Sequence, residues 1–85
     1  MEYVIVAFHV RAQTITFSSF LKDNGVYNQI VNTPKEAGVG CGLSVQVSPS
    51  QLEIVKRALS VGAFNSFAGV FKVKISGGGR SVKSI

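Results

Sequence analysis

The sequence of 85 residues is poor in residues that build metal and redox sites, since it has one cysteine and one histidine. A single cysteine excludes an intramolecular disulfide framework and favours a reducing compartment. One cysteine and one histidine also cannot form a closed zinc site. The four acidic residues are scattered along the chain, and a catalytic pair of carboxylates is not expected. We therefore predict that the protein holds neither a metal nor another cofactor.

Charged residues are scarce as well, at 15% of the chain, against about 25% in an average domain. The net charge is +5, and this mild basic excess fits an anionic small molecule or a protein partner as well as a nucleic acid. The predicted strand 43–47 lacks the aromatic and basic residues with which an RNA-recognition domain stacks bases. No specific nucleic-acid partner is therefore expected.

The longest apolar run, residues 3–8, has the length of a strand and not of a membrane span. The N-terminus also lacks the basic region, long apolar core and cleavage site of a signal peptide. These features predict a cytoplasmic protein that does not enter the membrane.

The order of hydrophobic patterns predicts an α+β domain of the ferredoxin-like type. Alternating or continuous apolar residues mark the strands, and residues at helical spacing with stop signals mark the helices. The expected order is β-α-β-β-α-β, with a four-stranded antiparallel sheet in the order 4-1-3-2 and both helices on one face. The elements are strand 3–8, helix 11–24, strand 26–31, strand 43–47, helix 48–60 and a strand within 67–75.

The predicted domain covers residues 1–75, and the Gly/Ser-rich basic segment 76–85 is expected to be a flexible tail. Local signals fill in the boundaries. Thr33 and Glu36 have the spacing of a capping box around Pro34. In helix 11–24, the buried stripe is expected to include Ala12, Ile15, Thr16, Ser19 and Phe20.

Strand 3–8 is apolar on both of its faces, although only one face can meet the helices. The other face would look onto water unless something covers it. Burying about three such side chains, at roughly 1.5–3 kcal/mol each, favours a homo-oligomer that pairs face to face. The tail, through Val82 and Ile85, is the alternative cover.

Cys41 is the strongest candidate for chemistry, because antiparallel pairing places the start of strand 43–47 beside the end of strand 3–8. Cys41 and His9 should therefore share one edge of the sheet. The start of helix 11–24 and Arg11 lie at the same edge, and their positive charge favours a thiolate. Gly40 and Gly42 allow the backbone to approach a ligand and leave the sulfur uncovered. The alternative is a cysteine that serves only as a small buried hydrophobe.

The segment Thr33-Pro34-Lys35-Glu36, followed by Cys41-Gly42-Leu43, resembles a bacterial family of small domains described as selenium/sulfur carrier-like. The resemblance spans about residues 3–73 and implies functional positions at Pro34, Glu36, Cys41 and Gly42. The family tends to have hydroxyl residues at the start of its first helix and before the cysteine. This chain has His9-Val10-Arg11 and residues 37–40 at these places, which removes hydrogen-bond donors.

Three functions follow from these observations. In the first, the Cys41 thiolate carries sulfur or selenium between a donor and an acceptor protein. The residues expected to bind around it are His9, Arg11, Pro34, Glu36, Gly40 and Gly42. In the second, the protein is a small-ligand or protein-binding module in which Cys41 only packs, and in the third it is a subunit of a larger complex. An independent enzyme is the weakest reading, because no nucleophile–base–orienter set is visible.

Overall fold

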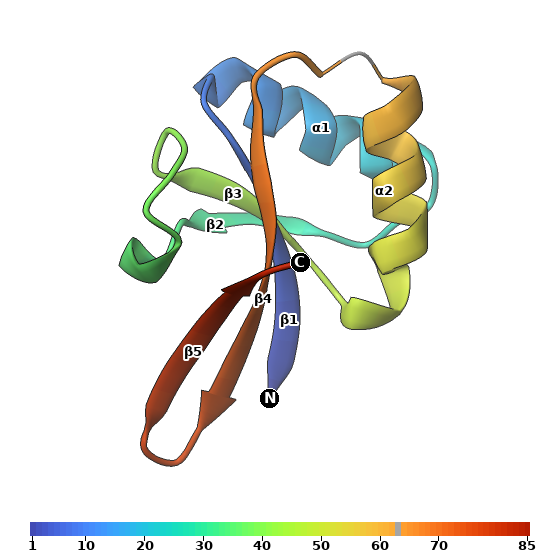
Figure 1. The fold of residues 1–85 in the computed structure, drawn as a ribbon. Coiled ribbons are helices and arrows are strands. Elements are labelled where there is room, and N and C mark those ends of the chain that lie inside the picture. Colours follow the sequence, from blue (N-terminus) through green and yellow to red (C-terminus); the bar gives the residue numbers. More distant parts are fainter. Residues whose placement is uncertain (63) are drawn as a thin grey trace.

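The computed structural model describes residues 1–62 and 64–85, which form one curved sheet with two helices against it (Figure 1). Two short 3₁₀ turns, η1 and η2, precede β3 and α2. The elements in order are β1 (Glu2–Phe8), α1 (Arg11–Asp23), β2 (Gln29–Asn32), η1 (Lys35–Ala37), β3 (Leu43–Val47), η2 (Pro49–Gln51), α2 (Leu52–Val61), β4 (Phe67–Ser76) and β5 (Gly79–Ser84).

The sheet is antiparallel with the order β2-β3-β1-β4-β5, so β1 is central. Its first four strands have the predicted relative order, but the predicted number of strands and the flexible tail are wrong. Segment 79–84 folds back on β4 as a fifth strand, with Ser76 paired to Gly79 and Val73 paired to Val82. Gly77 and Gly78 thus form the two-residue turn of this hairpin. The glycines therefore mark a turn between strands.

The second strand is shorter than predicted, since it begins at Gln29. Val26 instead follows the C-terminus of α1 and caps it: its N–H donates to the Leu21 carbonyl at 2.8 Å, just after Gly25 turns the chain with φ 78°. Asn28 is buried and is held by Ser18, whose hydroxyl lies 2.6 Å from the Asn28 Oδ1 atom. Val26 and Asn28, which were expected to lie in the second strand, are therefore hydrogen-bonded to α1 instead.

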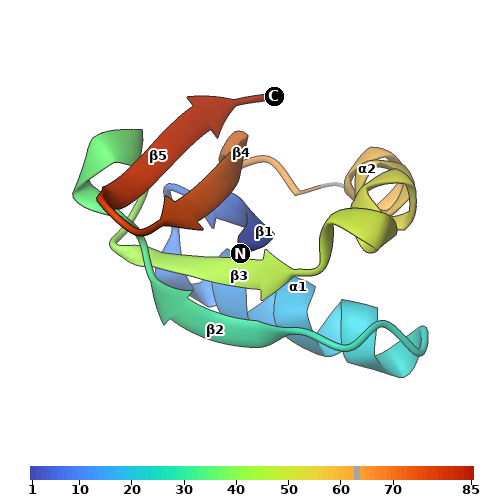
Figure 2. The same ribbon diagram turned by 90° about the horizontal axis from the view of Figure 1, so that it is seen from below.

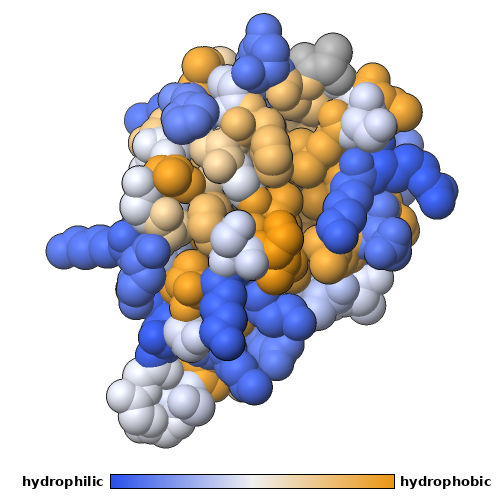
Figure 3. Space-filling view, in the orientation of Figure 1, coloured by the Kyte–Doolittle hydropathy of each residue, from blue (hydrophilic) through white to orange (hydrophobic). Residues whose placement is uncertain are grey.

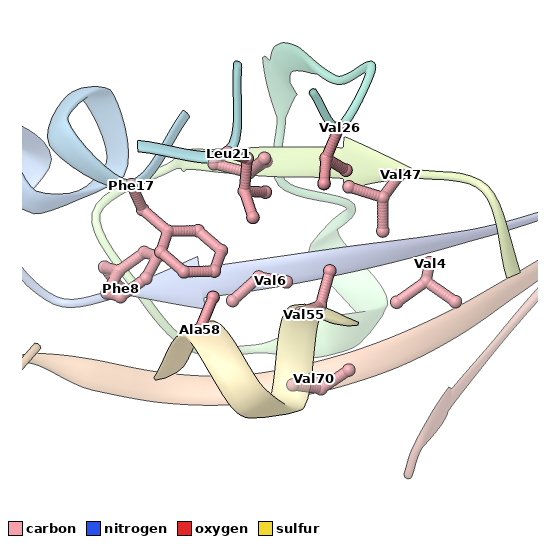
Figure 4. Packing of buried hydrophobic residues seen from close by; sticks show 11 residues of the cluster. Val4, Val6, Phe8, Phe17, Leu21, Val26, Val47, Val55, Ala58 and Val70 are labelled. Atoms are coloured by element: carbon pink, nitrogen blue, oxygen red, sulfur yellow. The ribbon is translucent and has the colours of Figure 1, made fainter. Parts of the chain in front are cut away.

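Both helices pack on one face of the sheet, as predicted, around a core that includes Val4, Val6 and Phe8 of β1 (Figure 4). The buried stripe of α1 differs from the predicted one. Its buried residues are Thr14, Phe17, Ser18 and Leu21, whose spacing of three, four and seven fits one helical face. The predicted stripe failed because two small hydroxyl residues, Thr14 and Ser18, are on the buried side.

An aromatic cluster fixes the end of β1. The Phe8 ring lies 5.3 Å from the Phe17 ring and 5.7 Å from the Phe64 ring, measured between centroids. The rings of Phe17 and Phe64 lie edge to face at 5.0 Å, an arrangement that aromatic pairs prefer. The cluster holds the C-terminal end of β1 against α1, and this end of the strand leads into the candidate site.

The opposite face of the sheet is also covered within the chain. Ile5, Ala7, Phe71 and Val73 are buried there, and partly buried side chains pack over them: Tyr3, Val31, Ala37, Ala68 and Val82. Figure 2 shows how the sheet curls, which brings β5 beside the turn η1. The tail, through Val82, helps to cover this face, so much of the apolar area on which the expected homo-oligomer was based is buried within the chain.

Polar residues gather over the far ends of β1, β4 and β5 (Figure 3). Lys72 and Lys74 each place their Nζ atom 3.8 Å from a carboxylate oxygen of Glu2. Both ion pairs are exposed, and such pairs contribute little to stability. Within residues 1–62 and 64–85, no helix is long and apolar enough to cross a membrane.

Candidate functional site

The loop from Thr33 to Gly42 closes on itself at the edge of the sheet. The Thr33 N–H donates to the Gly42 carbonyl at 2.9 Å, so this hydrogen bond joins the two ends of the loop that connects β2 to β3. The predicted capping box is wrong: the Thr33 hydroxyl pairs with the buried Ser44 hydroxyl at 2.6 Å, and Pro34 precedes the first residue of η1. Thr33 therefore ties the loop to β3 instead of capping a helix.

Gly40 is required where the loop meets β1. It has φ 92°, and a Cβ atom at this position would lie 3.0 Å from the Phe8 carbonyl oxygen and 3.5 Å from the Cβ of Ala7. Both the positive φ and the close approach make a side chain at this position unfavourable. The glycine lets the next residue, Cys41, donate its N–H to the same Phe8 carbonyl at 2.9 Å.

Cys41 is half-buried, and its sulfur has two polar neighbours. The Sγ atom lies 3.7 Å from the Thr14 hydroxyl of α1 and 3.7 Å from the Leu43 carbonyl oxygen. The prediction that Cys41 and His9 share an edge of the sheet is confirmed, because Cys41 is hydrogen-bonded to Phe8, the residue before His9. The sulfur meets α1 in its second turn, at Thr14, a residue that sequence reasoning did not select.

An open surface hollow of about 430 Å³ lies beside Cys41. It brings together four of the six predicted binding residues, namely His9, Pro34, Gly40 and Gly42. The other residues that line it are Thr33, Lys35, Gly38 and Val39. Gly40 and Gly42 flank Cys41 in the sequence, so the loop has the hollow on its outer side and the sulfur toward α1.

The other two predicted binding residues lie elsewhere. Arg11 is exposed at the start of α1. Glu36 of η1 accepts two hydrogen bonds from Arg80 of β5, at 3.0 Å from Nε and 2.8 Å from an Nη atom. These bonds to the guanidinium lower the pKa of Glu36 below its ordinary value. Glu36 therefore ties the site loop to the fifth strand.

The segment before β4 anchors the other side of the site. The His9 N–H donates to the Ser66 carbonyl at 2.7 Å, and the Val10 N–H donates to the Ser66 hydroxyl at 3.3 Å. The same hydroxyl donates to the Gln13 Oε1 atom at 2.8 Å. Ser66 thus supplies the polar cap that α1 lacks in its own sequence. A contact between residues this far apart in sequence leaves no local signal.

Across the two described ranges, no group of three or more His, Cys, Asp or Glu residues could hold a metal ion. The site offers one thiol, the imidazole of His9 and the ammonium of Lys35. This set can carry a covalent group on sulfur or hold a small anion.

A family model described as "Putative Se/S carrier protein-like" matches residues 2–65. The chain belongs to this family. The match includes Cys41, the whole site loop and Thr14, whereas β4 and β5 lie outside it. The resemblance predicted from the Thr-Pro-Lys-Glu and Cys-Gly-Leu motifs is thereby confirmed. No curated protein and no solved structure matches the chain.

Proposed function

We propose that this member of the Se/S carrier-like family carries sulfur or selenium as a covalent adduct on Cys41. The observation that supports this role is the placement of the chain's sole cysteine. Cys41 is half-exposed, its backbone is fixed to β1 through Phe8, and its sulfur lies beside the Thr14 hydroxyl. A carrier needs an accessible thiol on a rigid support and no further catalytic group.

The transfer is an exchange of sulfane sulfur. The Cys41 thiolate attacks the outer sulfur of a donor persulfide R–S–SH, a new S–S bond forms, and the old S–S bond breaks with R–S⁻ as the leaving group. The products are Cys41–S–SH and the donor thiolate, and the proton of the persulfide stays on the transferred sulfur. An acceptor thiolate reverses the sequence. Selenium follows the same path from a donor R–S–SeH.

A chain in this role depends on two partner proteins, one donor and one acceptor, and does not turn over by itself. A lone thiol of this kind persists in a reducing compartment, and we place the protein in the cytoplasm.

Whole-protein mass spectrometry tests the proposal with glutathione persulfide as the donor. The reduced chain is expected to gain the mass of one sulfur atom and to lose it on treatment with dithiothreitol. Cys41→Ser is the matched control and should gain nothing. The proposal is wrong if the native chain forms no sulfur adduct, or only a mixed disulfide with glutathione, under conditions in which iodoacetamide alkylates Cys41.

The hollow supports a second candidate, a module that binds a small anion without a covalent step. Its lining combines two basic side chains with a loop of glycines. Thiosulfate added to the Cys41→Ser variant should then shift the NMR amide signals of Gly38, Gly40 and Gly42. Unshifted signals in the variant, together with sulfur uptake by the native chain, would exclude this module.

A further inference from the structure

We propose that Thr14 is a positioning residue for the Cys41 sulfur, and that its hydroxyl stabilises the anionic form of that sulfur. The inference rests on the proposed carrier function, because it assigns a role in the same site. Thr14 lies one turn into α1, is fully buried and is within the family match. Its hydroxyl is the α1 group that meets the sulfur.

Three polar atoms form a closed triangle at this point. The Thr14 hydroxyl lies 3.4 Å from the Leu43 carbonyl oxygen and 3.7 Å from the Cys41 sulfur, and the sulfur lies 3.7 Å from the same carbonyl. When Cys41 is a neutral thiol, both the thiol and the hydroxyl can donate to the carbonyl, which has two lone pairs. Every group in the triangle is then satisfied.

Loss of the thiol proton changes which atom needs a donor. The sulfur becomes an anion beside the partial negative charge of the Leu43 carbonyl oxygen, which is unfavourable in a part-buried place. Rotation of the Thr14 hydroxyl turns its proton from the carbonyl to the sulfur and forms a charge-assisted hydrogen bond. The same threonine thus serves both protonation states without movement of the backbone.

The rotation of the Thr14 hydroxyl assists the transfer of sulfur to the acceptor as well as the attack on the donor persulfide. When an acceptor thiolate takes the outer sulfur from Cys41–S–SH, the S–S bond breaks and its electron pair stays on the Cys41 sulfur, which leaves as a thiolate. A hydrogen bond from Thr14 favours that leaving group. Both half-reactions form or consume the Cys41 thiolate, so one hydroxyl assists both.

A packing role alone does not explain a threonine here. Valine has nearly the same shape and would fill the same place beside Phe17 and Leu21 without a buried hydroxyl. Ser18, on the same face of α1, provides a comparison. Its hydroxyl donates to the Asn28 Oδ1 atom at 2.6 Å and not to the cysteine sulfur.

Three titratable or charged side chains lie in the segments around the site. They are His9 after β1 and Lys35 at the start of η1, which line the hollow, and Arg11, which is exposed at the start of α1; each is unchanged in the variants described next. A difference in pH dependence between those variants therefore reports on the Thr14 hydroxyl.

The test measures the rate of iodoacetamide alkylation of Cys41 against pH in the full chain and in Thr14→Val, Thr14→Ser and Ser18→Ala. We expect Thr14→Val to react about tenfold more slowly at neutral pH, the effect of losing one charge-assisted hydrogen bond, and its profile to move to higher pH. Thr14→Ser should restore the native profile, and Ser18→Ala should leave it unchanged. If Thr14→Val does not give the native circular dichroism spectrum, Thr14→Ala replaces it.

A Thr14→Val profile that coincides with the native one would overturn the role of Thr14, even if the native chain takes up sulfur from glutathione persulfide. The converse result is a shifted profile with no sulfur uptake by the native chain. That result would keep Thr14 as the residue that positions the thiol and would reject the carrier function. The two proposals therefore fail separately.

Discussion

Removal of β5 is the sharpest test of how this fold supports its site. In a chain that ends at Ser76, the second apolar cluster loses Val82, and η1 loses the contact between Glu36 and Arg80. Ile5 and Val73, which are fully buried in the complete chain, would then be partly open to water. The perturbation leaves the helix-side core untouched, because β5 contributes nothing to it.

The size of the effect follows from the uncovered side chains. Full exposure of a large aliphatic or aromatic side chain costs about 1.5–3 kcal/mol. Partial exposure of Ile5, Phe71 and Val73 should therefore lower the free energy of unfolding by about 2–4 kcal/mol. A small domain has only about 5–15 kcal/mol in total. The truncated chain should stay folded with a lower free energy of unfolding, and it should self-associate through the face that β5 covered.

Urea denaturation followed by circular dichroism gives the stability, and light scattering gives the mass. With a slope of about 1 kcal/mol per molar urea, the midpoint should fall by about 2–4 M. Two point variants separate burial from strand pairing: Val82→Ser should lower the midpoint, whereas Lys83→Ser, its exposed neighbour on the other face, should not. An unchanged midpoint and mass in the truncated chain would refute the claim that β5 covers the sheet.

Two further predictions concern the site loop. Gly40→Ala should destabilise the fold by about 1–3 kcal/mol, because it combines a positive φ with a close contact to the Phe8 carbonyl. Gly78→Ala is the control in the same urea assay, since the space around Gly78 is open and its φ is not positive. Equal urea midpoints for the two variants would contradict the tight packing of Gly40 against Phe8. The lowered pKa of Glu36 means that its pairing with Arg80 stabilises the fold above the ordinary pKa of Glu36 and is lost as the pH falls through the lowered value. An NMR titration should show this carboxylate titrating below its position in Arg80→Gln, and identical titration curves would disprove the ion pair.

Much of the fold could be predicted from local pattern. The apolar run from Tyr3 to Phe8 and the alternation from Leu43 to Val47 are strong strand signals, and both strands are present. Their antiparallel pairing then required Cys41 and His9 to share an edge, as they do. The family could also be identified from the sequence, because the chain contains both the Thr-Pro-Lys-Glu segment and the Cys-Gly-Leu motif.

The tertiary structure decided whatever depends on residues far apart in the chain. Segment 76–85 forms a strand because β4 has an open edge to pair with and because Val82 packs on an apolar face of the sheet. Neither condition can be inferred from the sequence of the segment itself. The same holds for Glu36, whose spacing to Thr33 suggested a helix cap. A bidentate partner, Arg80, lies 44 positions away, and that contact prevails over the weaker local one.

The sequence by itself determined which residue the proposed carrier function must use, since the chain has one thiol and covalent sulfur transfer requires one. It could not determine what surrounds that thiol. In the sequence Thr14 is only a β-branched residue of modest helix propensity, and the packing of α1 on β3 brings its hydroxyl to the Cys41 sulfur and the Leu43 carbonyl. The reactivity of a thiol depends on hydrogen bonds a few ångströms long. Here the partners in those hydrogen bonds come from segments far apart in the chain, so their distances are set by folding and cannot be inferred from the sequence.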